Sequence, residues 1–516
     1  MDSTKRIIVN TLAQYMKAVF TTCLSLYSTR LILDALNISD YGIYSVVGGV
    51  VALLGFITNA LIVTTQRYIS YYHGQGEITV VRKFFTNSLS LHILLGTTLA
   101  FVLVMMKGWL FDSFLNIPVE RIETAKTVYL LSIAMLLLTI LMAPFKALFI
   151  ARENIVFIAV VDSFDAIVKL GIAIGLAYIT ADKLLAYALL MTGIVLMNLL
   201  IFSIYAIIKF EECTLTIKTK DIGRQYLLPL IGFAGWTTFG MGASVLRTQG
   251  FAMVFNRFCG TTINAAYGIA LQVFSALSVI VTSVLNAMNP QIMKAEGNGD
   301  RTLMFRLAFQ ESKFSTALLA IFTIPLIIEM PAILGFWLKE VPDYSIAFCR
   351  FILIAFICDQ TTMGLHSVMQ AIGQLRNYSL LVFTPKILNL PLVWFMLFQG
   401  IDINWCMATY LIIELGVAII RIPYLKIAAQ LDIAAYIKKV ILPLLPLFLI
   451  STLTAVLCTC LPDYSFRFVG TIVLSILAGM STAWFFTITG TERQYVIKLI
   501  NDKLLHAVPK NKSLSH

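Results

Sequence analysis

Three charged side chains stand on one face of a single apolar segment, 155–179. Asp162, Asp165 and Lys169 follow one another at i, i+3 and i+7, which places them on the same side of a helix. Asp165 precedes Lys169 by four residues, a spacing that predicts an ion pair within the helix. Asp162 is left without a partner on its own helix. The set is therefore a structural ion pair that fixes this helix to a neighbour, a polar cavity wall, or a site where Asp162 binds a coupling cation.

Two arginines and a lysine form a second candidate group, suited to an anionic ligand. Arg30 and Lys17 lie in the apolar segment 10–33, and Arg247 lies near the end of the segment 225–248. A guanidinium binds phosphate through paired N–H groups. Arg30 and Arg247 would face each other across the molecule and hold the phosphate, with Lys17 extending the positive track. The simpler alternative is that Arg30 extends its guanidinium to the membrane surface.

Isolated charged residues elsewhere are most simply interpreted as structural residues. Glu414 in the segment 404–422 is a further candidate for ion coupling, and Arg67 follows the segment 42–65. Arg67 is an anchor of the kind found on cytoplasmic loops, and it could also join the two halves of the chain as an inner gate. The five histidines and eight cysteines show no metal-ligand spacing, so no metal or cofactor is expected.

Composition places the chain among membrane proteins. It has 516 residues, of which 59% are hydrophobic and 13% charged, against about 45–50% and about 25% in soluble domains. The apolar residues form runs of about 20, the length of a membrane-spanning helix, so the fold class is an all-α polytopic membrane protein. Fourteen spans fit: 10–33, 42–65, 84–106, 124–145, 155–179, 184–208, 225–248, 264–288, 309–337, 345–366, 379–399, 404–422, 440–460 and 467–489.

The net charge of +11 is also explained if the chain is a membrane protein. Lysine and arginine concentrate in alternate loops, which is typical of cytoplasmic loops and places both termini in the cytoplasm. This pattern, rather than nucleic-acid binding, accounts for the basic balance. No phosphate-binding loop, zinc-protease motif or nucleophile elbow is present, and no soluble domain interrupts the spans, so the chain is not expected to be an enzyme.

The chain also repeats two motifs at nearly the same spacing. Tyr-Gly-Ile occurs at 41–43 and 267–269, and Gly-x-Gly-acid at 74–77 and 297–300, so the copies are 226 and 223 residues apart. An even number of spans separates them, which predicts parallel repeats of the kind found in many secondary transporters. The predicted parts are an N-lobe at 1–208, a cytoplasmic linker at 209–224, a C-lobe at 225–422, two added spans at 423–489 and a basic cytoplasmic tail at 490–516.

Short motifs in both halves resemble one membrane-protein family. They are Ser-Thr-Arg-Leu-Ile-Leu at 28–33, Asp-Tyr-Gly-Ile-Tyr at 40–44, Thr-Gln-Arg-Tyr at 65–68, Asn-Ala-Ala-Tyr-Gly-Ile-Ala at 264–270 and Asn-Pro-Gln at 289–291. In order, they resemble the Wzx-type O-antigen flippases of polysaccharide biosynthesis. These belong to the multidrug/oligosaccharidyl-lipid/polysaccharide exporter superfamily.

The resemblance implies two pseudo-symmetric six-helix lobes around a cavity that opens to each side in turn. It implies a polyprenyl-pyrophosphate-linked oligosaccharide as substrate, flipped across the inner (cytoplasmic) membrane as a repeat unit of O-antigen, capsule or exopolysaccharide. Membrane lipids and other polysaccharide assembly proteins are the implied partners, and nucleic acid is not. Arg30, Arg247 and Lys17 match the family's cationic cavity residues, and the two added spans could shape a groove for the lipid tail.

A second function fits the same superfamily. A cation-coupled exporter of multidrug compounds or other small molecules would need acidic residues in its cavity, and Asp162 and Asp165 are the best evidence for it. The motifs favour the lipid-linked oligosaccharide, and the small-molecule exporter is the alternative.

Overall fold

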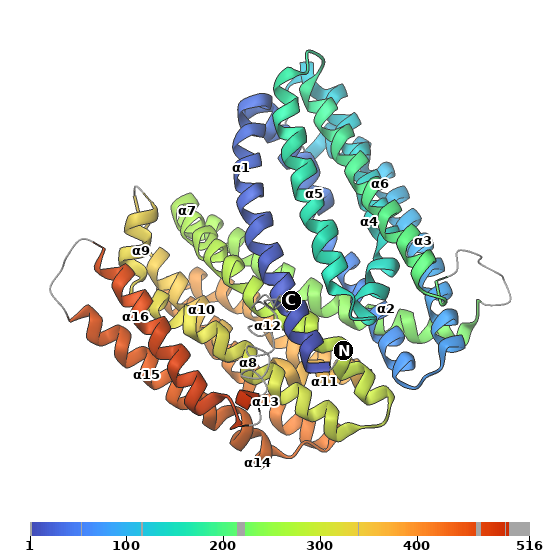
Figure 1. The fold of residues 1–516 in the computed structure, drawn as a ribbon. Coiled ribbons are helices and arrows are strands. Elements are labelled where there is room, and N and C mark those ends of the chain that lie inside the picture. The colour runs from blue at the N-terminus through green and yellow to red at the C-terminus, as the bar shows by residue number, and fades with distance from the viewer. Residues whose placement is uncertain are drawn as a thin grey trace, which may run out of the picture. The chain divides into compact units, whose positions relative to one another are not determined.

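The computed structural model consists of helices (Figure 1). It describes residues 3–52, 54–114, 117–213, 222–338, 340–460, 466–490 and 492–494, and no strand occurs within these ranges. Much of the predicted linker, at 214–221, and of the predicted basic tail, at 495–516, lies outside the described residues. The all-α class that the composition predicted is confirmed.

The α-helices are α1 Ser3–Ala52, α2 Gly55–Gly74, α3 Ile78–Trp109, α4 Ile122–Ala151, α5 Ile155–Gly175, α6 Lys183–Lys209, α7 Arg224–Gly297, α8 Arg301–Ile328, α9 Met330–Trp337, α10 Ser345–Gln360, α11 Met363–Ile372, α12 Leu375–Phe398, α13 Ile403–Ala429, α14 Ile433–Tyr436, α15 Leu442–Thr459 and α16 Arg467–Thr482. Short π-helical turns extend α3, α14 and α16, at Leu110–Phe114, Ile437–Ile441 and Ala483–Thr487. Side-chain caps fix some of the starts. Asp182 accepts the N–H groups of Leu184 and Leu185 at the start of α6, as expected of an N-cap residue.

Within the described residues, fewer helices have the length and apolarity of a membrane span than the fourteen predicted. Ten qualify, or eleven if α10 and α11, which bend by 49° at their junction, count as one broken span. The remaining predicted spans are 42–65, 155–179 and 225–248. The first is divided between α1 and α2, and α5 carries Asp162, Asp165 and Lys169 within a short length. The predicted number of fourteen spans stays a prediction.

Two helices are longer than predicted. Polar residues suggested loops at 34–41 and at 249–263. In the structure α1 continues through 34–41, and α7 continues beyond 248 as far as a kink at Gly260. Residues 34–41 contain neither glycine nor proline, so nothing in the sequence ends the helix there. In α7 the break falls at Gly260, whose φ of 85° lies in the left-handed region that favours glycine.

The chain divides into two compact units. Unit 1 comprises Met1–Val254, Thr282–Ala308 and Gly364–Ile401, and unit 2 comprises Phe255–Val281, Phe309–Met363 and Asp402–His516. The predicted lobe boundaries at 208 and 225 stay a prediction.

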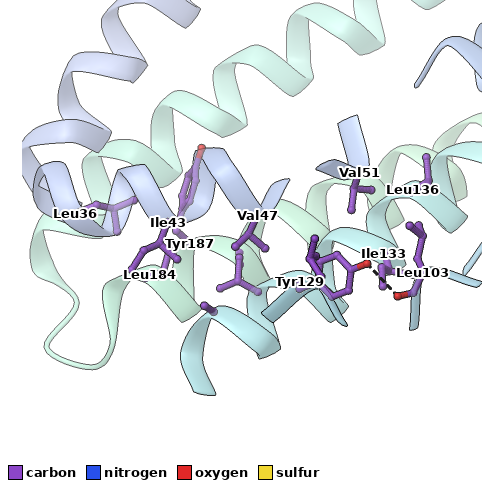
Figure 2. Close-up of a cluster of buried hydrophobic side chains, with 14 of the residues drawn as sticks. Leu36, Ile43, Val47, Val51, Leu103, Tyr129, Ile133, Leu136, Leu184 and Tyr187 are labelled. Carbon is purple, nitrogen blue, oxygen red and sulfur yellow. Dashed lines mark hydrogen bonds between the residues drawn. The ribbon is translucent and has the colours of Figure 1, made fainter. Parts of the chain in front are cut away.

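The core of unit 1 lies where α1, α4 and α6 meet (Figure 2). Leucine, isoleucine and valine side chains of α1 and α4 pack there around the fully buried ring of Tyr129. The Tyr129 hydroxyl donates to the Leu103 carbonyl of α3 at 2.9 Å. A buried hydroxyl needs such a partner, so this bond fixes α3 against α4.

An arginine joins three parts of unit 1 close to this core. Arg121 donates to both carboxylate oxygens of Asp40 on α1, from its Nε at 2.9 Å and its Nη2 at 2.5 Å. Its Nη1 donates to Asp182, the N-cap of α6, at 2.9 Å. Burial would raise the pKa of Asp182, but the Arg121 hydrogen bond and the Leu185 N–H outweigh it and hold the pKa below its usual value. The cluster therefore fixes the start of α6 to α1.

Unit 2 has buried ion pairs of its own. The Lys313 ammonium on α8 pairs with Glu492 at 2.9 Å, and Gln310 donates to the same carboxylate. Glu329, which precedes α9, accepts the Thr471 hydroxyl of α16 at 2.8 Å. These bonds attach α16, and the short segment after it, to the middle of the chain.

The Arg121 cluster predicts a pH-dependent loss of stability. Arg121→Met removes the charged donor and leaves two carboxylates close together, so we expect a loss of about 2 kcal/mol near neutral pH. Lys126→Met is the control, because the Lys126–Glu123 pair is largely exposed and a solvent-screened pair contributes little to stability. The pKa of Asp182 is lowered, so its stabilisation is present above pH about 4 and lost as the pH falls below it. Melting curves in detergent at pH 7 and at a pH of about 2.5 measure both effects; equal melting temperatures for the two variants at pH 7 would contradict the prediction.

Candidate functional site

An aspartate held between two lysines lies at the junction of α1, α4 and α5. Lys17 of α1 donates to Asp162 Oδ2 at 2.6 Å, and Lys146 of α4 donates to Asp162 Oδ1 at 3.3 Å. All three side chains are about one quarter exposed. The carboxylate is therefore shared between two cations and is partly open to whatever fills the space beside it.

This arrangement has the form of the first alternative, an ion pair between helices, and it includes a residue that the sequence analysis missed. Asp162 has no partner on its own helix and pairs with Lys17, which the sequence analysis assigned to a separate positive track. Lys146 was placed in a loop because the predicted span ended at 145. Helix α4 instead continues to Ala151 with Pro144 inside it, and this continuation directs Lys146 towards α5. Its ammonium also lies 5.6 Å from the centre of the Phe202 ring.

The second pair on α5 is the one predicted. Lys169 and Asp165 form an ion pair at 2.7 Å. The Asn198 amide of α6 donates to Asp165 at 2.7 Å, a contact that no sequence spacing indicates. Lys17, Lys146, Lys169, Asp162 and Asp165 are called the lysine–aspartate cluster below.

The lysine–aspartate cluster carries more positive than negative charge. Three lysines face two aspartates, and each aspartate is paired with at least one ammonium. An anion could bind beside Lys17 and Lys146, whereas a metal cation would first have to displace an ammonium from Asp162. The geometry thus permits a cation to replace a lysine ammonium as the partner of the Asp162 carboxylate.

The two arginines predicted to form a pair lie in different environments. Arg30 is exposed on α1, whereas Arg247 is buried on α7, with 8% of its surface exposed. Around Arg247, Gly250 packs closely against Leu390 of α12. The predicted phosphate-binding role of each arginine stays a prediction.

Glu414 belongs to unit 2 and is described separately. It is buried on α13 with 3% exposed. Arg421, two turns later on the same helix, pairs with Asp359 at 2.8 Å and donates to Thr362 at 3.1 Å, where α10 ends. The region around Glu414 therefore contains an ion pair that supports a broken helix, and its predicted part in ion coupling stays a prediction.

The two repeated Gly-x-Gly turns have the same backbone structure. In both, the second glycine has positive φ, +77° at Gly76 and +74° at Gly299. The hydrogen bonds are also equivalent. In the first turn, Gly76 N–H donates to His73 O at 3.2 Å and Glu77 N–H donates to Tyr72 O at 3.1 Å. In the second turn, Gly299 N–H donates to Glu296 O and Asp300 N–H donates to Ala295 O, both at 3.0 Å. This is the Schellman arrangement, which ends a helix with glycine in the left-handed region.

The first glycine of each turn contacts the other copy of the motif. A methyl group on Gly74 would lie 2.3 Å from the carbonyl oxygen of Lys294, and one on Gly297 would lie 2.0 Å from the carbonyl oxygen of Tyr71. Residues 71 and 294 are related by the same spacing of 223 as Gly74 and Gly297. The contact is therefore reciprocal: each turn packs on the backbone of its repeat mate, and only glycine leaves room for it.

Polar contacts surround the two glycines. Arg67 is buried and donates to the carbonyls of Ala371 and Ile372 at 3.0 and 3.1 Å, at the end of α11. In the other half, Gln291 donates to the Glu153 carboxylate at 3.1 Å, just beyond the end of α4. Gly74, Gly297, Arg67, Gln291 and Glu153 are called the turn cluster below. Each half of the repeat thus supplies a side chain that binds a helix end in the other half.

Solved structures share this fold. No family model matches the sequence, and no curated protein matches it. A MATE protein in complex with MaL6 superposes with a TM-score of 0.71 over 85% of this chain and 98% of its own, at 13% identity. A multidrug resistance MATE family transporter of the MOP superfamily, in an outward-facing conformation, gives 0.71 at 12% identity over 84% and 97%.

A third similar structure is a MOP superfamily transporter from Pyrococcus furiosus. It gives a TM-score of 0.72 at 12% identity over 84% of this chain and 97% of its own. Its description states that the reverse polarity of its binding pocket suggests a different function. The chain therefore has the fold of the MATE transporters of the MOP superfamily, which is a multi-pass membrane fold.

Because of the reciprocal glycine contact, we expect one added methyl group at either glycine to push the two turns apart. Gly74→Ala or Gly297→Ala places Cβ far inside contact distance of a backbone carbonyl, so the helix ends must move apart. Cysteines introduced by Gln75→Cys and Asn298→Cys, both exposed, report the separation through their rate of oxidative cross-linking. We expect cross-linking to slow about tenfold or more, since a strain of 1.4 kcal/mol already changes an equilibrium tenfold.

The matched control is Gly49→Ala, because Gly49 lies in α1 with open space around it. The exposed cysteines Cys23 and Cys460 are replaced by alanine in every sample. Cross-linking of Gly74→Ala and Gly297→Ala at the rate of the Gly49→Ala control would show that the turns do not pack as described.

Proposed function

We propose that this protein is a membrane exporter that works by alternating access, with its two repeats moving against each other around a polar site. The observation that carries the proposal is the reciprocal contact of Gly74 and Gly297. A contact made by equivalent turns of both repeats is suited to closing one side of the molecule, because a single relative movement breaks all of it. The similarity to MATE transporter structures supports the same mechanism.

The turn cluster is assigned to the cytoplasmic side as the inner gate. Basic residues concentrate around the two turns, as in cytoplasmic loops generally: Arg67, Arg82, Lys83, Lys294, Arg301 and Arg306. With this orientation both termini are cytoplasmic and the protein lies in the cytoplasmic membrane. Arg67 strengthens the closed gate by binding the end of α11.

Small organic molecules are the first candidate substrate class. A transporter of similar fold is described as a multidrug resistance protein. Coupling would proceed at Asp162 or Asp165: a proton or cation that neutralises Asp162 would release Lys17 and Lys146, and so loosen α1 and α4 from α5. Glu414 is the corresponding candidate in the other half.

A lipid-linked oligosaccharide is the second candidate, favoured by the surplus positive charge of the lysine–aspartate cluster. Lys17 and Lys146 could bind a pyrophosphate group, and the exposed Arg30 lies on the same helix as Lys17. The reverse polarity described for one transporter of this fold suggests that the fold accommodates pockets of either charge. Such a substrate would link the protein to other proteins of polysaccharide assembly.

Two substitutions separate these substrate classes. Lys146→Met removes one cation and should reduce flipping of a polyprenyl-pyrophosphate oligosaccharide in proteoliposomes about tenfold, since a charge-assisted hydrogen bond is worth about 1.5–3 kcal/mol. The same variant should leave export of a cationic dye such as ethidium unchanged or faster. Asp162→Asn should abolish gradient-driven dye export, because neutralisation of that carboxylate would be the coupling step.

Lys126→Met is the control for Lys146→Met, since both lysines lie on α4 and Lys126 is outside the cluster. If Lys146→Met and Asp162→Asn behaved like this control with both substrates, the lysine–aspartate cluster would have no part in transport.

A further inference from the structure

One half-buried histidine next to the turn cluster has no part in the proposed function. His73 immediately precedes Gly74 and lies beyond the predicted span 42–65. Its Nε2 accepts a hydrogen bond from Arg152, which follows α4. Arg152 also donates to Glu212, which follows α6 and is fully buried, at 2.6 Å. His73 therefore connects the end of α2 to the ends of α4 and α6.

The hydrogen bond requires a neutral imidazole. Because Nε2 accepts from a guanidinium, the proton of the neutral ring must be on Nδ1. Nδ1 is buried and has no hydrogen-bond partner among the described residues. A second proton would convert Nε2 from an acceptor into a donor that faces another donor, and the bond to Arg152 would be lost.

The charges around His73 also oppose its protonation. Burial, Arg152 and Lys294 of α7 lower the pKa of His73 to about 4, and only Glu212 acts in the opposite direction. Lys294 is the residue whose carbonyl packs against Gly74. An imidazolium at His73 would thus lie beside two cations, one of which belongs to the other repeat.

We propose that His73 is a proton-operated release for the turn cluster, in which protonation from the adjoining aqueous side breaks the Arg152 bond and drives the two turns apart. The inference rests on the proposed function only in assuming that the turns separate during the cycle. It adds a regulatory input: acidification on the side of the gate favours its open form.

The direction of the pH effect follows from linkage. The packed turns bind the proton only near pH 4, whereas a solvent-exposed histidine binds it near 6.5. The packed state is therefore fully stable above pH about 6.5 and weakens as the pH falls from about 6.5 to about 4. Over that window the equilibrium between packed and separated turns shifts by up to about two orders of magnitude.

Spin labels at Gln75→Cys and Asn298→Cys test this directly. Distances between them are measured by pulsed electron paramagnetic resonance in nanodiscs at pH 8, 6.5 and 5, with Cys23 and Cys460 replaced by alanine. We expect a longer-distance population that grows as the pH falls. His73→Gln keeps an acceptor but cannot be charged, so its distances should not change with pH, and His73→Arg should be separated at every pH.

His92→Gln is the matched control, because His92 is a buried histidine that lies on α3, away from the turns, and bonds to Ser88; its pH response should equal that of the parent protein. If the parent shows no pH dependence, or if His73→Gln retains it, the release function is wrong. Repeating the distance measurement with added ethidium or polyprenyl-pyrophosphate oligosaccharide distinguishes the histidine proposal from the proposed function. Turns that separate with ligand but not with acid would overturn only the histidine proposal, and turns that never separate would overturn alternating access.

Discussion

The close approach of two backbone segments at Gly74 and Gly297 is the constraint on which the rest of the arrangement depends. Each glycine lies where a methyl group would overlap a carbonyl oxygen of the other turn, so the contact exists only because both copies of the motif keep glycine. Close to this contact, Arg67 binds the end of α11 and Gln291 binds Glu153. Because backbone rather than flexible side chains meets at the centre, the turns are either packed or apart, and intermediate positions are unfavourable. A two-state contact of this kind is what alternating access requires.

The lysine–aspartate cluster imposes a second constraint of a different kind. A charge at the centre of a bilayer costs about 2.5–3.5 kcal/mol on the insertion scale, and pairing Asp162 with Lys17 and Lys146 reduces that cost. The pairing also joins three helices, so any ligand or proton that neutralises one member changes how these helices are held. The surplus positive charge favours binding of an anionic ligand, whereas a cation would first have to displace a lysine ammonium from Asp162. The proposed function thus assigns helix packing and ligand binding to the same few side chains.

The sequence predicted those features that depend on local pattern. The all-helical class, the Asp165–Lys169 pair and the equivalence of the two Gly-x-Gly turns were all predicted from composition or spacing, and the motifs indicated the superfamily whose fold the structure has. Features that depend on tertiary structure were missed. The Lys17–Asp162 pair joins residues 145 positions apart, and Lys146 was assigned to a loop because the predicted span ended at 145, whereas α4 continues to Ala151. Helix α1 continues through the polar stretch 34–41, and the break in α7 falls at Gly260 rather than directly after residue 248. Nothing in the sequence shows that the two turns, predicted to be equivalent, also contact each other.

The most direct test of alternating access is to lock the turn contact covalently. The Gln75→Cys and Asn298→Cys protein, oxidised to a disulfide across the packed turns, should lose export of ethidium or flipping of polyprenyl-pyrophosphate oligosaccharide, whichever the unmodified protein supports in proteoliposomes. A reductant should restore it, and each single-cysteine protein should be unaffected by the oxidant. Transport at the full rate while the two turns remain cross-linked would contradict the account, because substrate would then pass without the contact opening.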